Sequence, residues 1–102
     1  MTTKTLSSEI SGNITELKKL KEKDPTNQEL ISALQDMYDA LHQAQGKEWE
    51  AQVEQYKNAK QALDEAKQAA QEAINDLSKV ADTITKATSA VAKVLSALAF
   101  AL

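Results

Sequence analysis

Apolar residues recur every three or four positions through the first half of the chain. Over residues 6–23 the recurring apolar side chains are Leu6, Ile10, Ile14, Leu17 and Leu20. Over residues 26–45 they are Leu30, Leu34, Met37, Tyr38 and Leu41. This spacing places the apolar side chains of each segment on one side of an α-helix. The pattern therefore predicts two amphipathic helices, over about 6–23 and 26–45.

The stretch KDPTNQEL, residues 23–30, separates these two helices. A residue that precedes proline is disfavoured in the helical region, whereas proline itself suits the first turn of a helix. Asp24 is a candidate N-cap, and Thr26 with Glu29 fits a capping box. One helix therefore ends near Lys23 and the next begins near Pro25 or Asn27. A break this short predicts an antiparallel helical hairpin.

The second half of the chain carries a seven-residue repeat. Apolar residues occupy every seventh position, namely Trp49, Tyr56, Leu63, Ala70, Leu77, Ile84, Val91 and Leu98. Three positions later in each repeat, from Ala59 to Ala101, the residue is alanine or valine. Such a repeat is typical of a coiled-coil seam and predicts one long helix over about 48–100. Gly46 precedes this helix, and the sequence leaves open whether it breaks the chain or is passed through.

Together these elements predict an all-α fold in a single domain, residues 1–102, with residues 1–5 disordered. A continuous helix over 49–102 would be about 80 Å long at 1.5 Å per residue, whereas either earlier helix is at most about 30 Å long on the same rise. The hairpin could not cover it, so the seam would need a further helix from a second copy or from a cognate helical protein. The expected interface residues are Trp49, Tyr56 and Leu63, which would close the hairpin, and Leu77, Ile84, Val91, Leu95, Leu98 and Leu102.

Composition narrows the function classes. All 12 cationic residues are lysine, and the net charge is −3, which disfavours nucleic-acid binding because arginine is the preferred bidentate ligand of phosphate and guanine. The chain has no cysteine, one histidine (His42) and two glycines. Thiol catalysis, phosphate-binding loops and the usual zinc sites are therefore disfavoured. We expect a non-enzymatic protein with no catalytic, cofactor-binding or metal-binding residues.

The apolar tail, residues 87–102, raises the alternative of membrane contact. Lys93 interrupts it and Lys86 and Asp82 precede it, so the apolar run falls short of the roughly 20 apolar residues of a transmembrane helix. An interfacial helix, as in a membrane-active pore-forming toxin component, stays open. The first ten residues lack the apolar region of a cleaved signal peptide. We therefore expect a cytoplasmic protein, or one that is exported from the cytoplasm without a cleaved signal.

Residues 23–45, KDPTNQELISALQDMYDALHQAQ, resemble the needle subunits of bacterial type III secretion systems. The matching positions are Pro25, Thr26, Asn27, Leu30, Ile31 and Gln35, in and after the turn between the two helices. The resemblance covers about a quarter of the chain. It implies a secreted helical protein that assembles into a filament. The leading hypothesis is a self-assembling or export-associated structural protein, and a small helical chaperone or adaptor is a further alternative.

Overall fold

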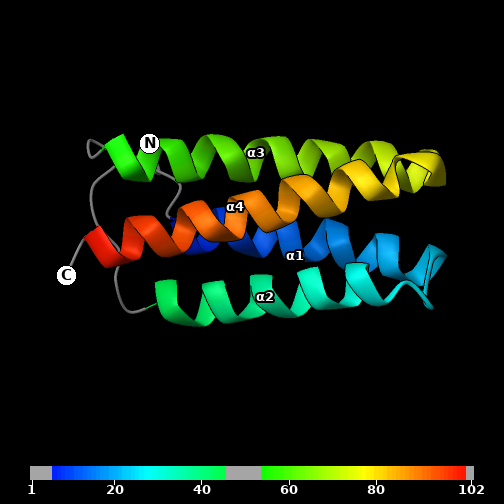
Figure 1. The fold of residues 1–102 in the computed structure, drawn as a ribbon, viewed down its shortest axis with the longest axis horizontal. Coiled ribbons are helices and arrows are strands. Elements are labelled where there is room, and N and C mark those ends of the chain that lie inside the picture. The colour runs from blue at the N-terminus through cyan, green and yellow to red at the C-terminus, as the bar shows by residue number, and fades with distance from the viewer. Residues whose placement is uncertain (1–5, 46–53, 101–102) are drawn as a thin grey trace.

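The computed structural model describes residues 6–45 and 54–100, and these residues form a helical bundle (Figure 1). The elements are α1 (Leu6–Lys23), α2 (Gln28–Ala44), α3 (Glu54–Asn75), the 3₁₀ turn η1 (Leu77–Lys79) and α4 (Val80–Phe100). Within the described ranges there is no strand, and the predicted all-α bundle is confirmed. The predicted disorder of residues 1–5 lies outside the described residues.

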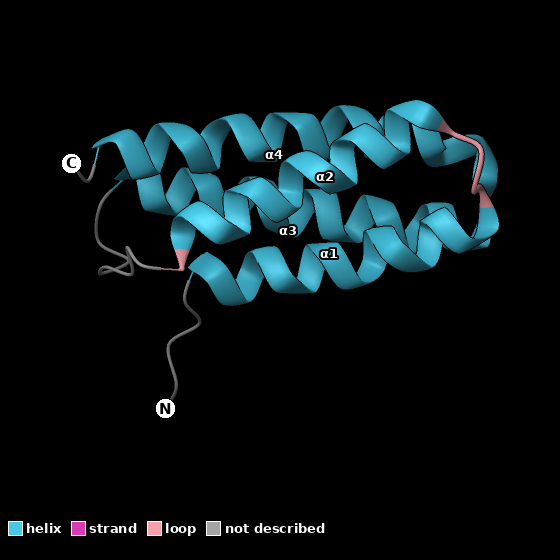
Figure 2. Cartoon of the chain, turned by 90° about the horizontal axis from the view of Figure 1, so that it is seen from below, coloured by secondary structure: helices cyan, strands magenta, loops and turns pink. Residues whose placement is uncertain are grey.

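Two helical hairpins lie side by side in the bundle. The helices α1 and α2 form the first hairpin and α3 and α4 the second, while α1 also packs on α3 and α2 on α4. Figures 1 and 2 show that α1 and α3 run in one direction and α2 and α4 in the other. The whole measures 37 × 26 × 17 Å, so its longest dimension is close to the length of one helix.

The continuous helix expected over 48–100 needs one correction, because the chain reverses at Asp76. This residue is extended (φ −149°, ψ 96°), and its Oδ1 accepts hydrogen bonds from the backbone N–H and the hydroxyl of Ser78, at 3.1 and 2.7 Å. These bonds cap the turn that begins α4. Leu77 continues the seven-residue repeat across the break, yet it is 47% exposed.

Because the chain reverses at Asp76, it forms two shorter helices in place of one long helix. These helices, α3 with 22 residues and α4 with 21, are close in length to α1 with 18 and α2 with 17. Helices of matched length can cover one another along their whole apolar faces. The repeat that predicts a coiled coil therefore packs within one chain, where α4 covers the seam of α3.

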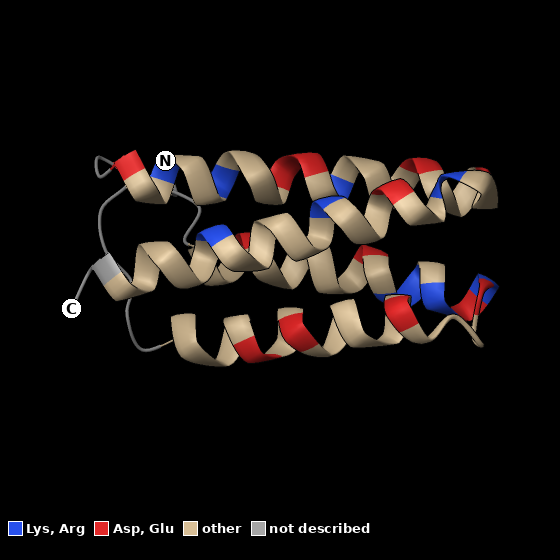
Figure 3. Cartoon of the chain, in the orientation of Figure 1, with Lys and Arg blue, Asp and Glu red and all other residues tan. Residues whose placement is uncertain are grey.

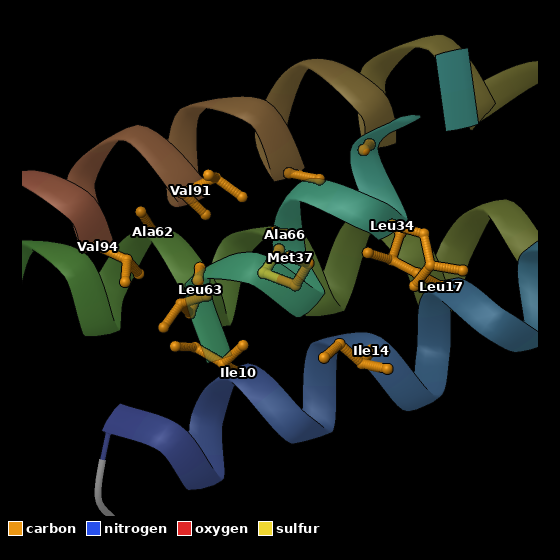
Figure 4. Packing of buried hydrophobic residues seen from close by; sticks show 14 of the residues in the cluster. Ile10, Ile14, Leu17, Leu34, Met37, Ala62, Leu63, Ala66, Val91 and Val94 are labelled. Atoms are coloured by element: carbon orange, nitrogen blue, oxygen red, sulfur yellow. The ribbon is translucent and has the colours of Figure 1, made fainter. Parts of the chain in front are cut away.

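Alanine dominates the buried face of α3. Its buried residues are Tyr56, Ala59, Ala62, Leu63, Ala66, Ala69, Ala70 and Ala73. Small side chains let neighbouring backbones approach closely, so larger side chains from the other helices fill the space between them. Figure 4 shows Ile10, Met37 and Val91 around Leu63 and the alanines of α3.

Two buried polar side chains connect α3 to its neighbours. Asn13 of α1 donates from Nδ2 to the carbonyl oxygen of Leu63 at 2.9 Å. The Thr83 hydroxyl of α4 shares its proton between the carbonyl oxygens of Ala69, at 3.0 Å, and of Lys79, at 3.1 Å. Both side chains are almost fully buried. A polar group in an apolar core is costly unless it is hydrogen-bonded, so these bonds favour one register of each helix pair. Asn13 also lies well inside α1, which spans Leu6–Lys23 as the apolar spacing predicts.

The turn between α1 and α2 is capped by Asn27. Its Oδ1 accepts a hydrogen bond from the backbone N–H of Leu30 at 3.1 Å, and its Nδ2 donates to Asp24 at 3.0 Å. The predicted hairpin is present, but neither Asp24 nor Thr26 is the N-cap, and the helix begins at Gln28. Asn27 takes this role because it is the residue directly before the first helical position, with extended backbone.

We expect Thr83→Val to lower the free energy of unfolding by about 1 kcal/mol, because valine keeps the shape but loses the bond to α3. Thr85→Val is the matched control: Thr85 is exposed, and its hydroxyl bonds to Ala81 of its own helix. The control should stay within about 0.5 kcal/mol of the unmodified protein. Urea unfolding measures both, and equal effects in the two variants would contradict an interhelical role for Thr83.

The Asp76 cap predicts a titration. Hydrogen bonds from the Ser78 hydroxyl and backbone N–H lower the pKa of Asp76 below its ordinary value. A lowered folded-state pKa means that this carboxylate stabilises the fold above its unfolded pKa, and that the contribution is lost as the pH falls through the folded value. Ser78→Ala should raise the pKa toward the ordinary value, as measured by NMR titration. No change on removing the hydroxyl would contradict the cap.

Candidate protein interface

An open groove runs between α2 and α4, the two parallel helices at one side of the bundle. Its volume is about 340 Å³, and its lining consists of Gln28, Glu29, Ser32, Ala33, Asp36, Ile84 and Thr88. We call this feature the α2/α4 groove. The helices α2 and α4 pack on each other through their buried faces. The exposed sides of the two helices next to this contact form the walls of the groove.

The α2/α4 groove combines an apolar base with an acidic edge. Ala33 is buried and Ile84 is half-buried against the core, whereas the carboxylates of Glu29 and Asp36 are exposed. Leu95 follows Ile84 by eleven residues, close to three turns of 3.6 residues, and so lies on the same flank of α4. Leu95 is 38% exposed and lies about 16 Å further along α4, with Thr88 and Val91 between the two. We call Ile84 and Leu95 together the apolar strip.

The charge of α2 is of one sign. Residues 28–44 contain Glu29, Asp36 and Asp39 and no lysine, and in Figure 3 the charged residues of α2 are all acidic. The ion pairs between described residues are Lys19–Glu16 within α1 and Lys86–Asp82 within α4, both at 3.5 Å. The acids of α2 form no ion pair with any described residue. The α2/α4 groove is therefore suited to a cationic partner.

A second hollow lies between α3 and α4. It has a volume of about 410 Å³ and is lined by Glu65, Gln68, Ala69, Glu72 and Lys86. Here the acids of α3 face a lysine of α4, so the hollow has no strong charge of one sign. Among the described residues there is no group of three or more histidine, aspartate or glutamate side chains placed to hold a metal ion. His42 is exposed on α2.

The residues expected at the interface divide into core, surface and undescribed positions. Tyr56, Leu63, Val91 and Leu98 lie in the core of the chain itself, and Ile84 is half-buried beside the groove. Leu77 and Leu95 are exposed, and Trp49 and Leu102 lie outside the described residues. In this fold, then, Val91 and Leu98 are not on a surface, because α4 turns its apolar stripe inward onto α3.

The groove residues of α2 were not among the expected interface residues. The available signal was the absence of lysine over residues 28–44, which the sequence displays. It could not be connected to α4, because only the reversal at Asp76 brings Ile84 beside Asp36. Tyr38, one of the recurring apolar residues of the second predicted helix, is 42% exposed.

Two further observations bear on partners and relatives. No helix in the described ranges has both the length and the hydropathy needed to cross a membrane. Comparison with protein-family models, with curated proteins and with solved structures found no match.

Shortening one buried and one exposed leucine of α4 to alanine tests which of the two side chains lies in the core. We expect Leu98→Ala to lower the free energy of unfolding by about 2–5 kcal/mol, since Leu98 is buried. Leu95→Ala, its neighbour on the same helix, should cost less than about 1 kcal/mol because its side chain is partly in water already. Urea unfolding at low protein concentration measures both. Equal losses would place Leu95 in the core.

Proposed function

We propose that this protein is a non-enzymatic structural protein that associates with further copies of itself through the face formed by α2 and α4. The observation that supports it is the apolar strip of Ile84 and Leu95, which stays partly exposed beside the α2/α4 groove although the rest of the apolar face of α4 is buried. Exposed apolar side chains on one flank of a helix are a candidate site of protein contact. The strip is thus apolar surface of α4 that is free to meet a partner in the folded bundle.

The mode of association follows from where the repeat is buried. A partner that required Val91 and Leu98 would have to open the bundle, because both pack inside the chain. A partner that used Leu95 and Ile84 could bind the folded bundle as it is. We therefore infer surface docking between folded copies in place of an extended intermolecular coiled coil.

The resemblance of residues 23–45 to needle subunits supports a role in an exported assembly. Those residues form the capped turn and the whole of α2, and α2 also supplies one wall of the α2/α4 groove. A protein of this kind would be made in the cytoplasm and leave it without a cleaved signal peptide. This role predicts that association continues beyond a dimer as the protein concentration rises.

Light scattering over a concentration series tests self-association. The molar mass of the unmodified protein should rise with concentration, and Leu95→Glu should lower the mass at each concentration because it places a charge in the apolar contact. Gln61→Glu is the control, since it adds the same charge at an exposed position of α3. It should leave the association unchanged.

The other outcomes point to different functions. A protein that remains monomeric at every concentration contradicts self-association. A fixed dimer that exchanges its subunit for a different helical protein would indicate a chaperone or adaptor. Leakage of phospholipid vesicles by the monomer, abolished by Leu95→Glu, would indicate membrane activity.

A further inference from the structure

A cluster of lysines lies at the end of α1. Residues 18–23 contain Lys18, Lys19, Lys21 and Lys23 with a single acid, Glu22, and all five side chains are exposed. We call these four lysines the α1 lysine cluster. Figure 3 shows it at the end of α1 that meets the turn to α2. Four lysines less one glutamate give this segment a charge of +3, the opposite of the −3 on α2.

Two members of the α1 lysine cluster are free to contact a partner together. Lys19 is paired with Glu16 of its own helix at 3.5 Å. Lys18 and Lys21 form no ion pair with any described residue, and their spacing of three positions places them as neighbours on the helix surface. They therefore present two adjacent ammonium groups to solvent.

We propose that the α2/α4 groove of one copy receives Lys18 and Lys21 of a second copy. This inference rests on the proposed self-association and names the two surfaces that meet. The groove offers two exposed carboxylates, Glu29 and Asp36, beside the apolar surface of Ile84. Lysine matches both features, because its aliphatic stem packs on apolar surface while its ammonium group reaches a carboxylate.

The two surfaces share no residue, although both lie near the turn between α1 and α2. The groove is formed by α2 and α4, whereas α1 packs against α2 and α3. In the proposed contact, one copy therefore receives a partner in its groove and offers its α1 lysine cluster to another. Each added copy brings a new groove and a new lysine cluster, which is the arrangement that generates open, growing assemblies.

Charge reversal at the two surfaces tests the contact. The first variant carries Lys18→Glu and Lys21→Glu, and the second carries Glu29→Lys and Asp36→Lys. Each should raise the concentration needed for association by at least about tenfold, because like charges then meet across the contact. Every substituted side chain is exposed. Circular dichroism should therefore report unchanged helix content in both variants.

A variant with all four substitutions gives the decisive result. Its net charge equals that of the unmodified protein, since two lysines and two acids are exchanged. The reversed surfaces attract each other again, so association should return to within a few-fold of the unmodified protein. Raising the salt concentration should weaken association in both proteins, because exposed ion pairs are screened.

The control reverses lysines elsewhere. Lys57→Glu with Lys93→Glu, on the exposed surfaces of α3 and α4, makes the same change in net charge as the first variant. It should associate at nearly the concentration of the unmodified protein. If the control needs as high a concentration to associate as the first variant, the effect is due to net charge alone and the proposed contact is overturned.

Failure of this contact can be told from failure of self-association. Charge-reversed variants that associate normally, while Leu95→Glu does not, would overturn the lysine contact and leave self-association standing. A fourfold variant that fails to recover association would also overturn the lysine contact alone. An unmodified protein that stays monomeric, or that binds only an added lysine-rich helical peptide, would overturn both proposals.

Discussion

Alanine at almost every buried position of α3 brings the backbones of α1 and α4 against that helix, and the rest of the bundle depends on this close approach. Only at short range can the side chains of Asn13 and Thr83 reach carbonyl groups of α3. Those two bonds, six residues apart along α3, hold α1 on one side and α4 on the other. The larger apolar side chains of α1, α2 and α4 then fill the remaining space.

The same packing decides which parts of α4 can meet a partner. Turned onto α3, α4 buries Val91 and Leu98 and leaves Ile84 and Leu95 on the flank beside α2. There the apolar strip borders a helix whose charged residues are all acids. An apolar strip with an acidic edge is more selective than an apolar strip alone, because the carboxylates disfavour acidic partners while the apolar surface provides contact area.

The same chain carries cationic side chains of complementary charge at the end of α1. The charged residues of α2 are all acids, whereas the end of α1 carries four lysines and one acid, and Lys18 and Lys21 form no ion pair with the described residues. Charges left unpaired in the folded monomer are available to a second copy at little cost, since they stay exposed until contact is made. The proposed self-association therefore combines a charge contact with apolar contact at the strip.

The sequence by itself determined the helical character, the first hairpin and the apolar faces, because local spacing and the turn around Pro25 suffice for these. It also showed the repeat from Trp49 to Leu98 and the absence of lysine over residues 28–44. Only the tertiary structure decided that the repeat folds back at Asp76. A seven-residue pattern is equally satisfied by a helix of the same chain or of another, and Leu77 keeps the pattern through the break. Ile84 and Asp36 therefore line one groove because of a reversal that no periodicity in the sequence encodes.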